Sequence, residues 1–368
     1  MTEPLSRTSA LASRHTALGS GLEDWNGMGT AWEYSSDPCD EHDAVREAAG
    51  LFDMSPLKKV RVSGPGAGAV VDHVATRDLS TIPAGKSAYG AVLTAAGTVA
   101  DDAIVFNMGD HWLFVHGSGA SMELLRESAE GRDASVELDD DLHDLALQGP
   151  RALELLDAHT PADLAGLSYF HHVDTELFGH PCTLSRTGYS GERGYEIFAA
   201  AESVGALWDA ILEAGAGIGV MPASFTALDK ARIEAALLFY GYDMTDDHTP
   251  WEVGLGWSLS RENRGFRGSE AAFAAEGAQR FLMAGVSVDH SDALAGGETL
   301  TVDGDVVGTV NSPGWSHRMQ KSLALVHLAP SAAEPGTTLE VSGDGVSTTA
   351  RVEQIPFYDP DKSRTHAA

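Results

Sequence analysis

The last quarter of the chain alternates short apolar runs with turns that contain Gly or Pro, and this pattern limits the folds available to it. The six runs are Met283–Val288, Glu298–Thr301, Val306–Val310, Ser322–Leu328, Thr338–Val341 and Ala350–Val352. Regularly spaced short strands of this kind are typical of a small antiparallel barrel or sandwich. Because the composition changes near Ala272–Gln279, we predict a domain boundary there.

The region before this boundary mixes helical and strand patterns. Apolar residues recur at helical spacing in Ala67–Ala75 and Ala227–Leu238. Tyr89–Leu93 and Asp102–Phe106 are predicted as strands, and Gly97 between them marks a hairpin turn. A chain of 368 residues with these elements is expected to form two or three domains that include an α+β part.

The charge balance excludes two large classes of function. The chain has 24 Lys and Arg against 54 Asp and Glu, so its net charge is −30. Nucleic-acid phosphates and anionic lipid surfaces would repel such a protein, so we expect neither as a partner. An acidic surface spread along the whole chain fits a high-salt cytoplasm, and it also fits an acidic protein of a mesophile.

Cysteine and histidine spacing predicts neither a disulfide framework nor a metal site. Cys39 and Cys182 are the only cysteines, and no Cys or His pair has metal-ligand spacing. His171 and His172 are adjacent, and neighbours on one element rarely face the same site. The polar N-terminus lacks a signal peptide pattern and no run is long enough to span a membrane, so we expect a cytoplasmic protein.

An acidic pair, Asp101 and Asp102, follows an apolar strand and a glycine turn in GTVADDAIVF. Neighbours on a strand point to opposite faces, so one carboxylate can face a cavity while the other faces away. A carboxylate in a cavity could bind an amine, carry a proton or stabilise developing positive charge. The alternative is an acidic pair that merely finishes a hairpin.

The segment RTGYSGERGYEI, residues 186–197, combines glycines, two tyrosines and a buried acid. Tyr189 and Tyr195 could stack on an aromatic heterocycle, and Glu196 needs a donor partner inside its apolar strand. The N–H groups of a 2-amino-4-oxo heterocycle would satisfy Glu196, and so would an ordinary salt bridge within a hairpin. The glycine spacing matches no phosphate-binding loop.

A third segment, residues 239–257, is rich in aromatic and acidic residues. Tyr240 and Trp251 in it could line a pocket for a small cationic substrate. A structured surface loop would have the same composition.

Taken together and in order, these segments resemble the glycine cleavage T-protein (aminomethyltransferase) family along nearly the whole chain. The matching segments are EHDAVREAAGLFDMS (41–55), VRVSGPGA (60–67), the Asp101-Asp102 segment, LALQGPRA (145–152), SRTGYSGERGYEIF (185–198), ARIEAALLFYGYDM (231–244), TPWEVGLGW (249–257), FRGSEA (266–271) and IPFYDP (355–360). The resemblance implies a three-part α+β ring with mixed and antiparallel sheets. Residues 1–276 would form a folate-binding catalytic region of two interleaved subdomains, and residues 277–368 an antiparallel β-barrel.

The resemblance also implies residue roles. It makes tetrahydrofolate the acceptor of a one-carbon unit and Asp101 the catalytic aspartate. Glu196 would bind the pteridine, and Tyr189 and Tyr89 would lie near it. Arg232 remains where the family contacts folate and is included in that site.

The chain departs from the family where the donor would be handled. The family's Ser-His-Met is Ser55-Pro56-Leu57 here, an asparagine is replaced at His116, and a folate-contacting arginine becomes Leu228. We place His116 in the substrate pocket beside Tyr240 and Trp251. These changes indicate a paralogue that accepts a one-carbon unit from a small N-, S- or O-methyl donor.

Two other functions stay open from the sequence. One is the T-protein reaction proper, which needs a lipoyl carrier protein. The other is folate binding without catalysis, although neither cysteine lies in the Lys-Gly-Cys motif of that branch. A flavin dehydrogenase would need a nucleotide-binding domain that this chain lacks, so it is expected only as a separate partner.

Overall fold

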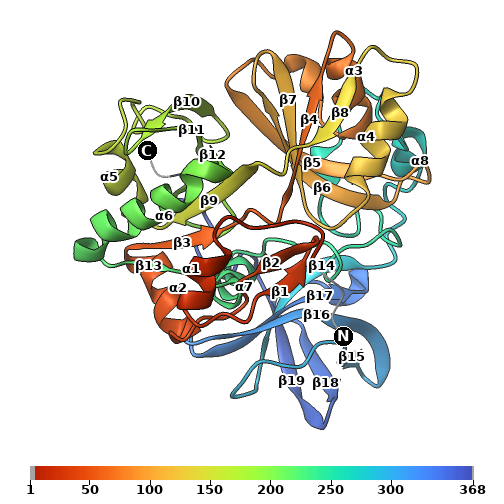
Figure 1. Cartoon of the computed structure of the whole chain (residues 1–368). Helices are drawn as coiled ribbons and strands as arrows, with labels where there is room; N and C mark the ends of the chain where they lie inside the picture. Colours follow the sequence, from red (N-terminus) through yellow and green to blue (C-terminus); the bar gives the residue numbers. More distant parts are fainter. Residues whose placement is uncertain (1–4, 367–368) are drawn as a thin grey trace.

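The computed structural model describes residues 5–366, which form three parts around a common centre (Figure 1). The first part is a five-stranded sheet in the order β5-β6-β7-β4-β8. Its strands are β4 (Lys58–Ser63), β5 (Lys86–Leu93), β6 (Val99–Asn107), β7 (His111–His116) and β8 (Ser135–Leu138). Helices α3 (Ala67–Val74) and α4 (Ser121–Ala129) pack on this sheet, and their apolar sides share one core with Val60 and Phe114.

The second part is a six-stranded sheet in the order β10-β11-β12-β9-β3-β13. Its strands are β3 (Ala49–Asp53), β9 (Leu142–Gln148), β10 (His172–Leu177), β11 (His180–Ser185), β12 (Gly194–Ala200) and β13 (Val220–Pro222). Four helices accompany it: α1 (Ala12–Ala17), α2 (Pro38–Glu47), α5 (Ala152–Asp157) and α6 (Ala201–Gly215). The β13–β3 pair is parallel and the other pairs are antiparallel, so the sheet is mixed.

Local sequence signals explain where two central helices begin. The Asp37 carboxylate accepts a hydrogen bond from the Cys39 amide at 2.8 Å and Pro38 occupies the first turn of α2. The Ser224 hydroxyl accepts from the Ala227 amide at the start of α7 (Phe225–Glu234). The predicted helix Ala227–Leu238 is wrong at its end, because Ala236 adopts a φ of 52° and the chain leaves the helix after Glu234.

The third part is a closed barrel of six antiparallel strands, and it resolves the choice between barrel and sandwich. Its strands are β14 (Leu282–Val288), β15 (Thr299–Val302), β16 (Asp305–Ser316), β17 (Lys321–Leu328), β18 (Thr338–Gly343) and β19 (Val346–Glu353). Alternate residues such as Leu339 and Val341 point into its apolar core. The boundary predicted between residues 276 and 277 falls in the loop between α8 (Ser269–Ala274) and β14.

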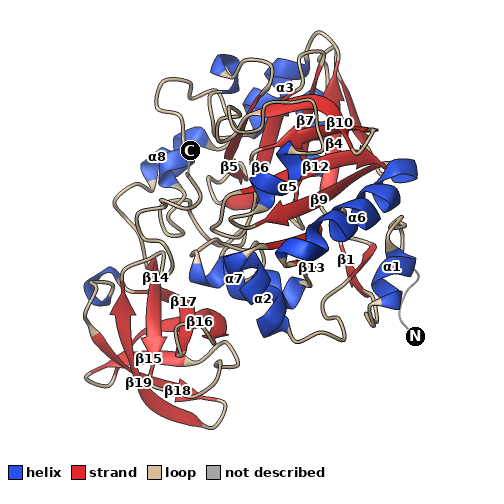
Figure 2. Cartoon of the chain, turned by 90° about the vertical axis from the view of Figure 1, so that its left-hand side faces the viewer, coloured by secondary structure: helices blue, strands red, loops and turns tan. Residues whose placement is uncertain are grey.

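Seen from the side, the barrel lies below the two sheets, and α7 and α2 lie at the level between them (Figure 2). A short two-stranded sheet, β1 (Glu23–Trp25) with β2 (Met28–Thr30), completes the elements before α2. The α+β ring with its C-terminal barrel is thus confirmed as the fold. None of the helices formed by residues 5–366 has the length and apolarity needed to cross a bilayer.

Candidate functional site

A cavity of about 700 Å³ lies where the three parts meet. The first sheet contributes Tyr89, Asp102 and Ile104, and the second sheet and its loops contribute Thr187 and Glu196. Further walls come from the segment 235–240 after α7, from Met283 of the barrel and from the C-terminal segment 355–366. The volume lies within the range of about 300–1,000 Å³ that small-molecule sites occupy.

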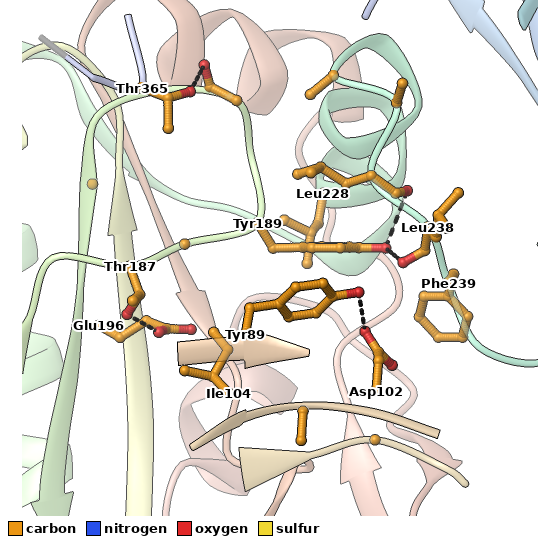
Figure 3. A pocket seen from close by; sticks show the side chains of 18 of the residues that line it. Tyr89, Asp102, Ile104, Thr187, Tyr189, Glu196, Leu228, Leu238, Phe239 and Thr365 are labelled. Atoms are coloured by element: carbon orange, nitrogen blue, oxygen red, sulfur yellow. Dashed lines mark hydrogen bonds between the residues drawn. The ribbon is translucent and has the colours of Figure 1, made fainter. Parts of the chain in front are cut away.

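Asp102 is the acid that the first sheet presents to this cavity. Its Oδ2 accepts a hydrogen bond of 2.9 Å from the Tyr89 hydroxyl, which comes from the neighbouring strand (Figure 3). Burial raises the pKa of Asp102 to about 7, and the charge of Asp101 contributes to the rise. A carboxyl with that pKa can both give and take a proton near neutral pH.

Asp101, which the sequence placed at the reaction site, is fully buried and is not among the described residues that line the cavity. Strand alternation turns its side chain to the opposite face of β6, toward α4. Its Oδ2 accepts hydrogen bonds from Ser121 Oγ at 2.6 Å and from His116 Nδ1 at 2.8 Å. Asp101 therefore anchors the loop between β7 and α4, which supplies Gly117 and Ser118 to the cavity wall.

His116 lines the cavity at the end of β7, as predicted, but its imidazole is directed to Asp101. Since a carboxylate only accepts hydrogen bonds, we assign the hydrogen to Nδ1. Within residues 5–366, His116 Nε2 is buried without a hydrogen-bond partner. His116 holds the loop through Asp101, and its role toward a substrate stays a proposal.

Glu196 lines the cavity together with three other acids, Asp102, Glu192 and Asp359, and β12 carries it there by alternation. Tyr195, its neighbour, points into the core, where its hydroxyl donates to Leu164 O at 3.1 Å; the predicted stacking role of Tyr195 is therefore wrong. Glu196 accepts a short hydrogen bond from the Thr187 hydroxyl. Burial raises the pKa of Glu196, while the Thr187 bond opposes that rise.

Two glycines of the 186–197 segment are explained by a protein neighbour. A Cβ at Gly188 or at Gly194 would lie 2.0 or 2.4 Å from the Gln148 side chain. At Gly188 and Gly194 the backbone therefore comes close to the Gln148 side chain on β9. The packing leaves the Thr187 and Glu196 side chains directed to the cavity (Figure 3).

Two tyrosines supply aromatic surface, as the sequence suggested. The Tyr189 hydroxyl donates to Leu238 O at 2.5 Å, which fixes its ring beside the segment after α7. In Figure 3 the Tyr89 ring lies between Tyr189 and Ile104, with Glu196 and Asp102 on opposite sides of it. Both tyrosines line the cavity, and burial raises both of their pKa values well above 10, so they stay neutral.

Of the three remaining predicted site residues, one lines the cavity and two do not. Tyr240 lines the cavity, whereas Arg232 and Trp251 are not among the described residues that do so. Arg232 is buried against the Asp243 carboxylate at 2.6 Å and Ser312 Oγ at 2.9 Å, because α7 directs it toward the barrel. The Trp251 indole N–H donates to Ala272 O at 2.7 Å, and its ring packs against an apolar cluster that Tyr89 and Tyr240 also contact. The structure therefore does not bring Arg232 and Trp251 to the cavity wall, where the sequence placed them.

Sequence reasoning missed several residues of the cavity. Thr187 stands in the highlighted segment, but nothing in its spacing marked it as the donor to Glu196. Trp257 is 62% exposed and stacks on Tyr89 with ring centroids 6.1 Å apart, so it marks the cavity mouth. Thr365 and other residues of the C-terminal segment close another wall, and their position depends on the fold of the whole chain.

The arrangement places Asp102 and Glu196, two separated members of the four acids that line the cavity, in one volume with apolar and aromatic walls. Glu196 can recognise N–H donors of a flat heterocycle, and Tyr89 and Tyr189 offer ring faces to it. Asp102 can hold a proton at a different point of the same volume. The cavity is therefore suited to one extended ligand that is held at Glu196 and reacts near Asp102.

Comparisons with known proteins give a consistent result. Residues 11–263 match the GCVT N-terminal domain and residues 282–359 the glycine cleavage T-protein C-terminal barrel domain. The chain is 46% identical to the heme-dependent oxidative N-demethylase gamma subunit of Ectopseudomonas mendocina, with 98% of each chain covered. It is 33% identical to the aminomethyltransferase of Streptomyces avermitilis, with 97% and 98% covered.

A solved structure supports the fold. The crystal structure of the glycine cleavage system aminomethyltransferase T from Bartonella henselae superposes with a TM-score of 0.88. It covers 96% of this chain and 98% of that one, at 24% sequence identity.

Proposed function

The chain belongs to the glycine cleavage T-protein (aminomethyltransferase) family, and from this premise we propose that it is a tetrahydrofolate-dependent one-carbon transferase whose donor is a small N-methylated amine. The observation that carries the proposal is that Asp102 and Glu196 line one cavity. One acid binds the acceptor and the other serves the transfer.

The residues present fit a reduced pterin. Glu196 is a buried carboxylate, and a flat 2-amino-4-oxo ring offers it two parallel N–H donors, which supports charge-assisted pairing. Tyr89 and Tyr189 supply aromatic surface on the way from Glu196 to Asp102. The volume of about 700 Å³ accommodates a ligand longer than the pterin alone.

When bound, tetrahydrofolate supplies the nitrogens that take up the one-carbon unit. The chain's own contribution at that point is the Asp102 carboxyl, which Tyr89 orients through the 2.9 Å hydrogen bond. With a pKa of about 7, Asp102 can protonate a leaving oxygen or nitrogen and then recover the proton. Apolar walls, among them Ile104, Leu228 and Phe239, limit the access of water.

The choice of an N-methyl donor rests on the N-demethylase gamma subunit, which resembles the chain over its whole length. In an oxidative N-demethylation the methyl carbon leaves nitrogen at the oxidation level of formaldehyde. We therefore propose that a separate oxidative demethylase, heme-dependent as in that relative's name, oxidises the amine. This chain would then capture the carbon on tetrahydrofolate, giving methylene-tetrahydrofolate and water.

The T-protein reaction with a lipoyl carrier protein is the second candidate, because aminomethyltransferases are 32–35% identical to this chain. The departures at Pro56, Leu57 and Leu228 favour the first candidate, since Leu57 and Leu228 both line the cavity. Folate binding without catalysis is the third candidate, and a product assay distinguishes it from both transferases.

The experiment offers purified chain and tetrahydrofolate a panel of donors. The panel contains N-methylated amines with an oxidative demethylase, formaldehyde alone, S-methyl and O-methyl compounds, and an aminomethyl-lipoyl carrier protein. The folate product is identified by mass and its rate is compared with the rate without the chain. Acceleration with the N-methyl donors supports the proposal. Acceleration only with the lipoyl carrier protein contradicts the proposal. The proposal is also contradicted if none of the donors gives a rate above the rate without the chain.

A further inference from the structure

We propose that His42, Asp43 and His317 form a binding site for a divalent transition-metal ion, with Zn²⁺ as its best representative, at the contact between α2 and the barrel. Each residue brings one ligand atom within 4.8 Å of the other two. Two imidazoles and a carboxylate are the nitrogen and oxygen donors that Zn²⁺ accepts, and a water molecule would complete a tetrahedral set. The inference is independent of the folate cavity.

Two ring nitrogens of this cluster, His42 Nδ1 and His317 Nδ1, are buried without a hydrogen-bond partner among residues 5–366. His42 Nε2 lies 3.0 Å from Glu234 Oε2, and a carboxylate can only accept, so the hydrogen belongs on Nε2. In the neutral ring the lone pair is then on Nδ1, and His42 Nδ1 is buried without a partner among residues 5–366. His317 shows the same pattern: its Nε2 lies 2.9 Å from Asp43 Oδ1, and its Nδ1 is a second buried orphan.

The Glu234 carboxylate holds the His42 ring in place from the side opposite to Nδ1. Histidine ligands of metals usually donate their other N–H to a carboxylate, which fixes the ring and strengthens the ligand. Glu234 takes this place, and its carboxylate is held in turn by Arg46 Nη2 at 2.8 Å and by Ser316 Oγ at 2.7 Å. The His42 ring is thus positioned by a network from α2, α7 and β16.

The two rings already meet edge to face at the contact between α2 and the barrel. The His42 and His317 ring centroids are 5.0 Å apart at an interplanar angle of 77°. Tetrahedral ligands of Zn²⁺ are about 3.4 Å apart, so closure requires movements of about 1 Å. His317 and Asp43 can make them, because their side chains are 19% and 40% exposed, whereas His42 is fixed in the interior.

Arg318 is the group that competes with a cation. Its Nη1 lies 2.6 Å from Asp43 Oδ1 and 2.8 Å from Glu47 Oε1. A bound metal would take Asp43 from Arg318 and from its hydrogen bond with His317 Nε2, and would leave Arg318 its contact with Glu47. Removal of the guanidinium should therefore strengthen metal binding, an effect that misfolding cannot imitate.

The test measures Zn²⁺ binding by the full chain after treatment with a chelator, in competition with a chromogenic zinc indicator. We expect one Zn²⁺ per chain, at least tenfold weaker binding in His317→Ala and Asp43→Asn, and tighter binding in Arg318→Ala. His290→Ala, which removes another histidine of the barrel region, is the matched control and should bind as the unaltered chain does.

Thermal unfolding gives a second readout. Zn²⁺ should raise the Tm of the unaltered chain by about 2 °C or more, because it binds the folded state, and it should not raise that of His317→Ala. The proposal is overturned if the unaltered chain binds no stoichiometric Zn²⁺. It is equally overturned if His317→Ala and Asp43→Asn keep its affinity.

Discussion

Replacement of Asp102 by Asn should make the protein more stable at alkaline pH and nearly inactive. The folded state raises the pKa of Asp102 from 3.8 to about 7, so the folded chain holds a proton that the unfolded chain has released between about pH 4 and 7. Stability therefore falls as pH rises through that window. The rise of the pKa of Asp102 from 3.8 to about 7 corresponds to about 4 kcal/mol, and we expect about half of it because the side chain lines a cavity and not the closed core.

Asn does not titrate, so Asp102→Asn should gain about 2 kcal/mol of unfolding free energy at pH 8 and nothing at pH 4. Turnover should drop by about 10²–10⁴, the usual contribution of a positioned acid or base, while folate affinity stays within about threefold. Urea unfolding at the two pH values, folate titration and the product assay by mass measure the three quantities.

Asp101→Asn is the matched control, with a stability change of opposite sign. Asp101 Oδ2 accepts from His116 and Ser121, so loss of the charge should cost about 2–3 kcal/mol at pH 8. The charge of Asp101 helps to raise the pKa of Asp102. In Asp101→Asn, turnover should therefore begin to fall at a lower pH than in the unaltered chain. Normal turnover in Asp102→Asn, or a loss of stability at pH 8, would refute the reasoning.

The remaining predictions concern binding, pH and the connection between the parts. Glu196→Gln should weaken tetrahydrofolate binding by about 1.5–3 kcal/mol in calorimetry, and unchanged affinity would remove Glu196 from the site. Turnover of the unaltered chain should fall as pH rises through about 7, where Asp102 loses its proton, and a flat profile between pH 6 and 8 would contradict that role. Glu234→Gln should lower the unfolding free energy by about 3–5 kcal/mol in urea, because it leaves buried Arg46 underpaired; a change below about 1 kcal/mol would contradict it.

The sequence predicted the fold and the composition of the site better than the direction of its side chains. Turn spacing was enough for the barrel strands, and the aromatic residues Tyr89 and Tyr189 line the cavity as expected. Strand alternation indicated that one of Asp101 and Asp102 could face a cavity while the other faced away. Which one depends on how β6 pairs with β5 and on which face α4 covers, and a single sequence does not contain that information.

Contacts between residues far apart in the chain explain why the sequence misplaced Arg232 and did not reveal the histidine pair. Arg232 was assigned to folate, but it pairs with Asp243 and reaches Ser312 of the barrel, which is 80 residues away in the chain. His42 and His317 are 275 positions apart, so no spacing motif can reveal them as a pair. Residues that meet only through the fold leave no local pattern.

The most direct test of the central claim is a crystal structure of the chain with bound tetrahydrofolate. We expect the pterin in the cavity, with its N–H groups in hydrogen-bond contact with Glu196 and its reactive nitrogen nearer to Asp102 than to Asp101. A pterin bound outside this cavity, or bound in it with Glu196 turned away, would contradict the account.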